Sequence, residues 1–212
     1  MEDYENSVFI NCPFDEDFAP ILEAMLFCVV RAGLKPRLAS ERLEAGENRL
    51  DKILEIIGNC KYSIHDLSLA TAREAGEPFR MNMPFELGLD MGRRKAPDPE
   101  TADKRYIIFE DKPYELKRCL SDLAGTDVAY HKRDFRKVIK CLRDFFRVEA
   151  GCALPGPTAL ENEYYDFQGW MVEKKINEGH TEEEATQLPT QERLDEMVVW
   201  NTLGRPIKLE DD

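Results

Sequence analysis

The chain has 212 residues, of which 42% are hydrophobic and 33% are charged, so it is long enough to bury a core in one or two domains. It contains no apolar run of the roughly 18 residues that a membrane span requires, and we expect no membrane partner. Its 42 acidic and 29 basic residues give a net charge of −13. Such a chain repels phosphate backbones at long range, so nucleic acid is not expected as a partner.

The first residues and the cysteines indicate the cellular compartment. The chain opens with an acidic stretch over residues 1–5, whereas a signal peptide has a basic start and then an apolar run. No two cysteines are spaced as in a CxxC motif, and the three histidines are far apart, so we expect neither a metal site nor a redox motif. Free thiols are typical of a reducing environment. The sequence therefore predicts a cytoplasmic protein.

Residues 1–150 alternate strand and helix patterns. A β-prone run at 7–11 ends before Pro13, and apolar residues at helical spacing follow over 17–32. Asn48 is suited to cap a helix over 49–59. The other expected elements are strands at 36–40, 62–67, 106–109 and 127–131 and helices at 84–93, 113–122 and 133–147. Five such repeats predict an α/β domain over residues 1–150, with a five-stranded parallel sheet and helices on both faces.

Residues 151–212 differ from the rest in charge. They hold 14 acidic and 5 basic residues, and a break rich in proline and glycine at 152–157 precedes them. We expect an acidic helical extension, with a helix over 158–177 capped by Thr158, a capping box at Thr181 and Glu184, and a last helix ending near Asn201. Its aromatic residues favour two interpretations, namely packing onto the first domain or a surface for homo-oligomer formation.

Candidate ligand-binding residues follow the predicted strands, because open parallel sheets bind ligands beyond the carboxyl ends of their strands. Around the helix at 84–93, further polar residues reach the same edge, and a guanidinium group at position 49 suits a phosphate. The candidates are Asn11, Cys12, Phe14 and Asp15 after the first strand, Asp66 and Ser68 after the third, and Arg49, Arg80, Asn82 and Glu86 on the neighbouring segments.

Glu86 is the candidate with the clearest chemistry. With Pro84 at the first helical position, it lies in the first turn of a helix that faces the crevice, where the helix dipole favours an ionised carboxylate. Such a group can attack or stabilise an electron-poor anomeric carbon. Gly88 is expected to let a ring or a strand approach closely. A glutamate at the third helical position is also typical of a capping residue, so both interpretations stay open.

Several other chemistries receive less support. His65 is interpreted as a packing residue, because strand alternation turns it away from the neighbouring Asp66. Cys12 would be a nucleophile only with a histidine beside it, and the pattern places none there. The chain has neither GxGxxG nor GxxxxGK[ST], which excludes a dinucleotide fingerprint and a P-loop.

Three segments carry a family resemblance: Asn11-Cys12-Pro13-Phe14-Asp15, Asp66-Leu67-Ser68 and Met83-Pro84-Phe85-Glu86-Leu87-Gly88. Together they resemble the nucleoside 2-deoxyribosyltransferase-like group and the related Toll/interleukin-1 receptor (TIR)-like NAD-cleaving domains of bacteria. The resemblance covers about residues 7–147 and implies a flavodoxin-like sheet. It implies that Glu86 is the nucleophile or stabilises the ribosyl cation, that Asp66 contacts the base or ribose, and that residues 11–15 lie under the ligand.

The resemblance also implies an activity. We expect cleavage of the N-glycosidic bond of a small-molecule nucleotide or nucleoside, with NAD as the favoured substrate, no cofactor, and a role such as antiphage defence. The chain lacks the dense Asp-Gly cluster that deoxyribosyltransferases often have, which favours hydrolysis over base exchange. The alternative is a non-catalytic nucleotide-sensing or protein-interaction scaffold, because a fold does not fix a function.

Overall fold

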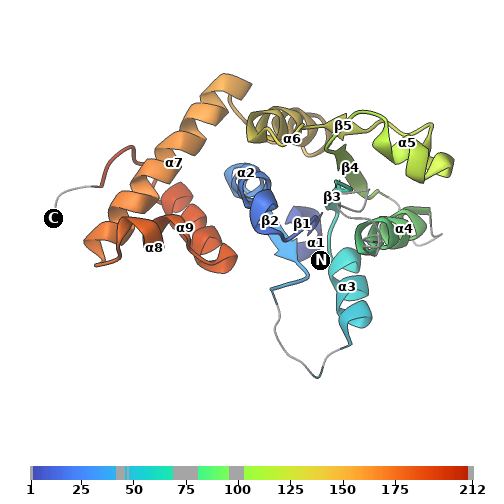
Figure 1. The fold of residues 1–212 in the computed structure, drawn as a ribbon, viewed down its shortest axis with the longest axis horizontal. Coiled ribbons are helices and arrows are strands. Elements are labelled where there is room, and N and C mark those ends of the chain that lie inside the picture. The colour runs from blue at the N-terminus through green and yellow to red at the C-terminus, as the bar shows by residue number, and fades with distance from the viewer. Residues whose placement is uncertain (1, 42–45, 47, 69–80, 96–102, 210–212) are drawn as a thin grey trace. The chain divides into compact units, whose positions relative to one another are not determined.

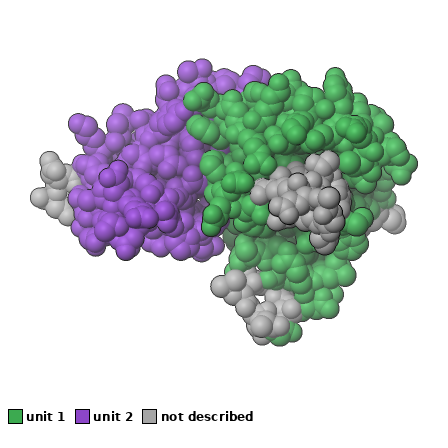
Figure 2. Space-filling view, in the orientation of Figure 1, with its two compact units in different colours: residues 1–22, 34–137 green, residues 23–33, 138–212 purple. Residues whose placement is uncertain are grey.

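The computed structural model of the protein describes residues 2–41, 46, 48–68, 81–95 and 103–209. The chain divides into two compact units, which are coloured separately in Figure 2. The first unit consists of residues 1–22 and 34–137, and the second of residues 23–33 and 138–212. The C-terminal helices therefore share a unit with parts of two earlier helices, whereas the sequence placed all of residues 1–150 in one domain.

The first unit contains a five-stranded, all-parallel sheet in the order β2-β1-β3-β4-β5 (Figure 1). Its strands are β1 (Ser7–Asn11), β2 (Lys35–Leu38), β3 (Tyr62–Asp66), β4 (Arg105–Glu110) and β5 (Ala129–Tyr130). Because β1 pairs with β2 on one side and β3 on the other, the strand order reverses at the β1–β3 pair. This is the strand order of a flavodoxin-like fold, and it confirms the expected α/β class.

Helices alternate with these strands along the chain. They are α1 (Glu2–Asn6), α3 (Arg49–Gly58), α4 (Asn82–Lys95) and α5 (Glu115–Cys119), with short 3-10 turns at Glu16–Phe18 and Ser121–Leu123. Two more helices, α2 (Ala19–Arg31) and α6 (Phe135–Glu149), run from the first unit into the second. The Asn48 side chain accepts hydrogen bonds from the N–H groups of Leu50 and Asp51, which confirms the predicted cap.

The position of α4 differs from the prediction in a way that matters for the site. The helix begins at Asn82, two residues before the expected start, because the N–H of Phe85 already donates to the carbonyl of Met81. Pro84 is therefore the third helical residue and not the first. Glu86 consequently lies in the second turn of the helix, not the first.

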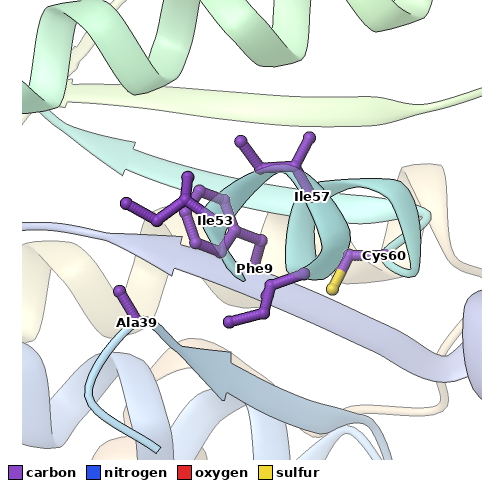
Figure 3. Packing of buried hydrophobic residues seen from close by; sticks show 6 residues of the cluster. Phe9, Ala39, Ile53, Ile57 and Cys60 are labelled. Atoms are coloured by element: carbon purple, nitrogen blue, oxygen red, sulfur yellow. The ribbon is translucent and has the colours of Figure 1, made fainter. Parts of the chain in front are cut away.

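One face of the sheet packs against α3, α4 and α5. Under α3, Phe9 of β1 lies against Ile53 and Ile57, with Ala39 and Cys60 beside them (Figure 3). The neighbouring cluster joins α4 and α5 to β4 through Leu67, Met83, Leu87, Ile108 and Leu116. Each fully buried aliphatic side chain contributes about 1.5–3 kcal/mol to the free energy of folding. This packing holds the start of α4 next to the end of β1.

The second unit has its own aromatic core. Its helices are α7 (Pro157–Asn177), α8 (Glu182–Thr186) and α9 (Thr190–Thr202). The ring centroid of Phe27 in α2 lies 5.1 Å from Tyr164, 6.1 Å from Phe167 and 5.9 Å from Trp200. The aromatic residues of the acidic extension therefore pack with a residue from the first 150. Homo-oligomer formation through residues 151–212 stays a prediction.

The caps of these C-terminal helices follow the sequence in part. Thr181 and Glu184 form the predicted capping box at the start of α8. The predicted cap of α7 by Thr158 is wrong, because the helix begins one residue earlier, at Pro157, with Gly156 in the cap position. Proline suits the first helical position because it has no N–H to leave unpaired. In the described part of the chain, every helix is too short or too polar to cross a membrane.

Candidate active site

A hollow of about 520 Å³ lies at the carboxyl end of β1, within the first unit. Its walls come from the end of β1 and the loop after it, from the residue after β2, from the first residue of α3 and from the start of α4. The lining residues are Ile10, Asn11, Cys12, Pro13, Phe14, Asp15, Ala39, Arg49, Met81, Asn82, Met83 and Glu86. The hollow adjoins the reversal of strand order, where open α/β sheets bind ligands, and its volume suits a small molecule.

Most of the candidate residues from the sequence line this hollow. They are Asn11, Cys12, Phe14, Asp15, Arg49, Asn82 and Glu86. Asp66 and Ser68 are buried in a separate cluster, and Arg80 lies outside the described residues. The carboxyl edge of the sheet was therefore a good guide for the loop after β1 and for α4, but not for the end of β3.

Glu86 lies in the wall of the hollow with only 6% of its surface exposed. As the fifth residue of α4 it is beyond the capping positions, and the dipole effect assumed for the first turn falls off before it. No described residue donates a hydrogen bond to its carboxylate. Burial raises its pKa to about 7, and the positive charge of Arg49 lowers it in part. A carboxyl group that titrates near neutral pH is typical of catalytic acids and bases.

Behind the hollow, four buried polar side chains contact one another in sequence, and we call Asn11, His65, Asp90 and Lys104 the buried relay. The Asn11 amide Nδ2 lies 2.9 Å from the carbonyl of Met83 and 3.0 Å from His65 Nδ1. His65 Nε2 lies 3.0 Å from Asp90 Oδ2, and Asp90 Oδ1 lies 3.1 Å from Lys104 Nζ. Asn11 is 3% exposed and the other three are fully buried.

The inner end of the buried relay joins the end of α3. Lys104 Nζ donates to the carbonyl oxygens of Ile57, at 2.8 Å, and Cys60. A cation at this end of α3 complements the helix dipole. Burial acts to raise the pKa of Asp90, but the hydrogen bond from His65 and the charge of Lys104 hold it below its usual value. Asp90 is therefore a buried carboxylate that stays ionised.

A second cluster holds Asp66, Ser68 and His131. His131 Nε2 lies 3.0 Å from Asp66 Oδ2 and 3.1 Å from Ser68 Oγ, while its Nδ1 accepts a hydrogen bond from the N–H of Arg133. The other oxygen of Asp66 accepts from the N–H of Ser68. In a catalytic triad the serine and the aspartate bind opposite nitrogens of the imidazole, which is not the case here. The cluster joins the ends of β3 and β5, and Asp66 does not line the hollow.

The structure agrees with the sequence on Cys12 and differs from it on Gly88. Cys12 is almost fully buried, and burial together with the negative charges of Asp66 and Glu86 raises the pKa of its thiol well above the usual value. The thiol is therefore neutral and a poor nucleophile. Gly88 does not lie at a close approach, since an added Cβ would meet no described atom within 4 Å.

Sequence reasoning missed three residues of these clusters. His131 directly follows β5, so the rule that selected Asp66 would have selected it as well. Asp90 falls on the buried face of α4 with Met83 and Leu87, and an acidic residue in an apolar stripe is a usable signal. Lys104 gave no signal, because a lysine before a strand is normally exposed. The interpretation of His65 as buried is confirmed, with hydrogen bonds at both ring nitrogens.

No protein-family model matches this chain, and no curated protein matches its sequence. Its function therefore has to be inferred from the geometry of the hollow and the groups around it.

Proposed function

We propose that the protein cleaves the N-glycosidic bond of a nucleotide, with NAD as the favoured substrate and Glu86 acting at the anomeric carbon. The observation that carries this proposal is a carboxyl group without a hydrogen-bond donor among the described residues, in the wall of a hollow at the reversal of strand order. Burying such a carboxylate lowers the stability of the fold, and the charge of a cationic ligand would offset that loss.

The chemistry follows from the charge that develops during cleavage. As the bond from C1′ to the nicotinamide nitrogen breaks, its electron pair goes to that nitrogen and the sugar becomes cationic. An ionised Glu86 stabilises this cation or forms a bond to C1′. Water then adds its oxygen to C1′ and loses a proton. The products are nicotinamide and the hydroxylated sugar nucleotide, and the reaction needs no oxidant or reductant.

Other residues of the hollow suit the rest of a nucleotide. Arg49 is exposed and can contact a phosphate through its guanidinium group. Phe14 leaves half of its surface exposed, which offers a flat apolar face to a base. Asp15 and Asn82 supply polar groups for sugar hydroxyls. These are the ligand types that a nucleotide presents together.

The alternative, a non-catalytic scaffold or nucleotide sensor, has less support. In that role Glu86 would serve as a cap of its own helix and the groove would be filled. Instead Glu86 lies in the second turn of α4, and its hollow has room for a ligand.

The direct test is chromatography of NAD and of a nucleoside panel after incubation with the protein. Wild type should release nicotinamide from NAD, and Glu86→Gln should release at least a hundredfold less, because the amide carries no charge. Glu182→Gln is the matched control, since Glu182 is exposed on α8. Full activity of Glu86→Gln would show that the assigned role is wrong. The proposal also fails if no compound is cleaved and none raises the melting temperature.

A further inference from the structure

The side-chain amide of Asn11 has one orientation in the structure. Its Nδ2 donates to the carbonyl of Met83 at 2.9 Å and to His65 Nδ1 at 3.0 Å. A backbone carbonyl can only accept, so the amide atom next to Met83 has to be the nitrogen. No described residue donates a hydrogen bond to the carbonyl oxygen Oδ1 at the opposite end of the amide, since both hydrogen bonds of this side chain involve Nδ2. Asn11 is also one of the residues that line the hollow.

The rest of the buried relay keeps the amide in that orientation. Since His65 Nδ1 accepts from Asn11, the imidazole carries its proton on Nε2, which donates to Asp90 Oδ2 at 3.0 Å. Lys104 Nζ lies 3.1 Å from the other oxygen of Asp90, and the attraction between the two charges favours this orientation of the carboxylate. None of these three side chains lines the hollow. Of the buried relay, only Asn11 lines the hollow.

We infer that the buried relay orients Asn11 so that its Oδ1 accepts a hydrogen bond from a sugar hydroxyl, and that the site thereby selects ribosyl ligands over their deoxy analogues. Asn11 is the contact and His65, Asp90 and Lys104 are positioning residues. The inference rests on the proposed function, because it takes the ligand to be a nucleotide or nucleoside. Asn11 as a whole residue is 97% buried, so we expect its Oδ1 to lose a hydrogen bond when the hydroxyl is missing, and that penalty rejects the analogue.

The test measures binding, so it does not depend on turnover. Adenosine, 2′-deoxyadenosine and 3′-deoxyadenosine are titrated into wild type, Asn11→Leu and the control Asn177→Leu, whose exposed asparagine ends α7. Wild type and the control should bind adenosine about tenfold tighter than one of the deoxy compounds. In Asn11→Leu that ratio should fall to about one, with the affinity for the deoxy compound retained.

Two further measurements address the positioning residues. Asp90→Asn keeps the shape of the side chain and should also reduce the ratio towards one, with less effect on the deoxy compound. Nitrogen NMR of wild type should place the His65 proton on Nε2 and show Nδ1 as an acceptor, whether or not the Asp90 variant folds. A proton on Nδ1 would overturn the positioning role.

The outcomes separate this inference from the proposed function. If wild type binds all three compounds equally, the hydroxyl contact is wrong while the hollow remains a nucleoside site. If adenosine is preferred as expected but NAD is not cleaved, the inference holds and the catalytic proposal fails. If none of the three compounds binds, both the hydroxyl contact and the assignment of the ligand class are overturned.

Discussion

Two buried carboxyl groups stand one turn apart on α4 and behave in opposite ways. Glu86 faces the hollow, has Arg49 as the cation that acts on it, and has its pKa raised to about 7 by burial. Asp90 lies deeper, accepts from His65 and pairs with Lys104, and has its pKa held below the usual value. Both are shielded from water, at 6% and 0% exposure. Burial alone therefore does not decide their charge, and the partners do.

The difference separates two uses of the same helix. In its middle, α4 supplies the Asp90 carboxylate, which contacts His65 of β3 and pairs with the buried Lys104. One turn earlier, it supplies the Glu86 carboxyl group in the wall of the hollow, to which no described residue donates a hydrogen bond. Environments that push the pKa values of neighbouring acids apart are typical of sites where one acid reacts and the other supports it.

The largest effect on stability is expected when the charge of Asp90 is removed. Asp90→Asn leaves the ammonium group of Lys104 buried without its counter-ion, so we expect the free energy of unfolding to fall by about 3–5 kcal/mol. Urea unfolding at neutral pH measures this change. A loss below about 1 kcal/mol would mean that the pair is not buried in solution.

Removing the charge of Glu86 should raise the free energy of unfolding, whereas removing that of Asp90 should lower it. Because the pKa of Glu86 is raised in the folded state, wild type loses stability as the pH rises from about 4.5 to above 7, and glutamine does not titrate. We therefore expect Glu86→Gln to be more stable than wild type by roughly 2–3 kcal/mol at pH 8.5. Near pH 4.5 the two should be equal. Urea unfolding across this range tests the sign, which reverses if Glu86 is paired.

The charge of Arg49 affects how far the pKa of Glu86 lies above that of Asp90. Its charge lowers the pKa of Glu86, so Arg49→Met should shift the rising limb of the pH–activity profile to higher pH. The same variant should weaken binding of AMP about tenfold and leave adenosine unchanged, because it removes the proposed phosphate contact. Arg118→Met, on the exposed side of α5, is the control. Equal losses for AMP and adenosine would show that Arg49 contacts something other than phosphate.

A surface carboxylate should show the smallest effect on the free energy of unfolding among these acidic residues. Asp144 in α6 contacts Lys140 and Arg143, which hold its pKa below the usual value, but its side chain is 45% exposed. Water and salt screen such pairs, so Asp144→Asn should change the free energy of unfolding by less than about 0.5 kcal/mol. The same urea titration serves for this variant and for Asp90→Asn. A loss as large as that of Asp90→Asn would mean that exposure is a poor guide to the energy of ion pairs in this protein.

The sequence alone determined the order of strands and helices, the α/β class and the edge of the sheet where the hollow lies. These follow from local rules, since apolar periodicity marks each element and parallel strands all end at one edge. Glu86 was found in this way. Its two-residue shift along α4 was not, because the exact start of a helix depends on which carbonyl accepts the first hydrogen bond.

Only the tertiary structure decided the ionisation of the buried acidic groups in and around the site. The partners of Asp90 come from β3 and from the segment before β4, and Asp66 meets His131 across 65 residues of chain. No local pattern encodes such contacts, because they depend on which side chains the packing of separate elements brings together. The same holds for Glu86, whose pKa is raised because the carboxylate is buried and no described residue donates a hydrogen bond to it.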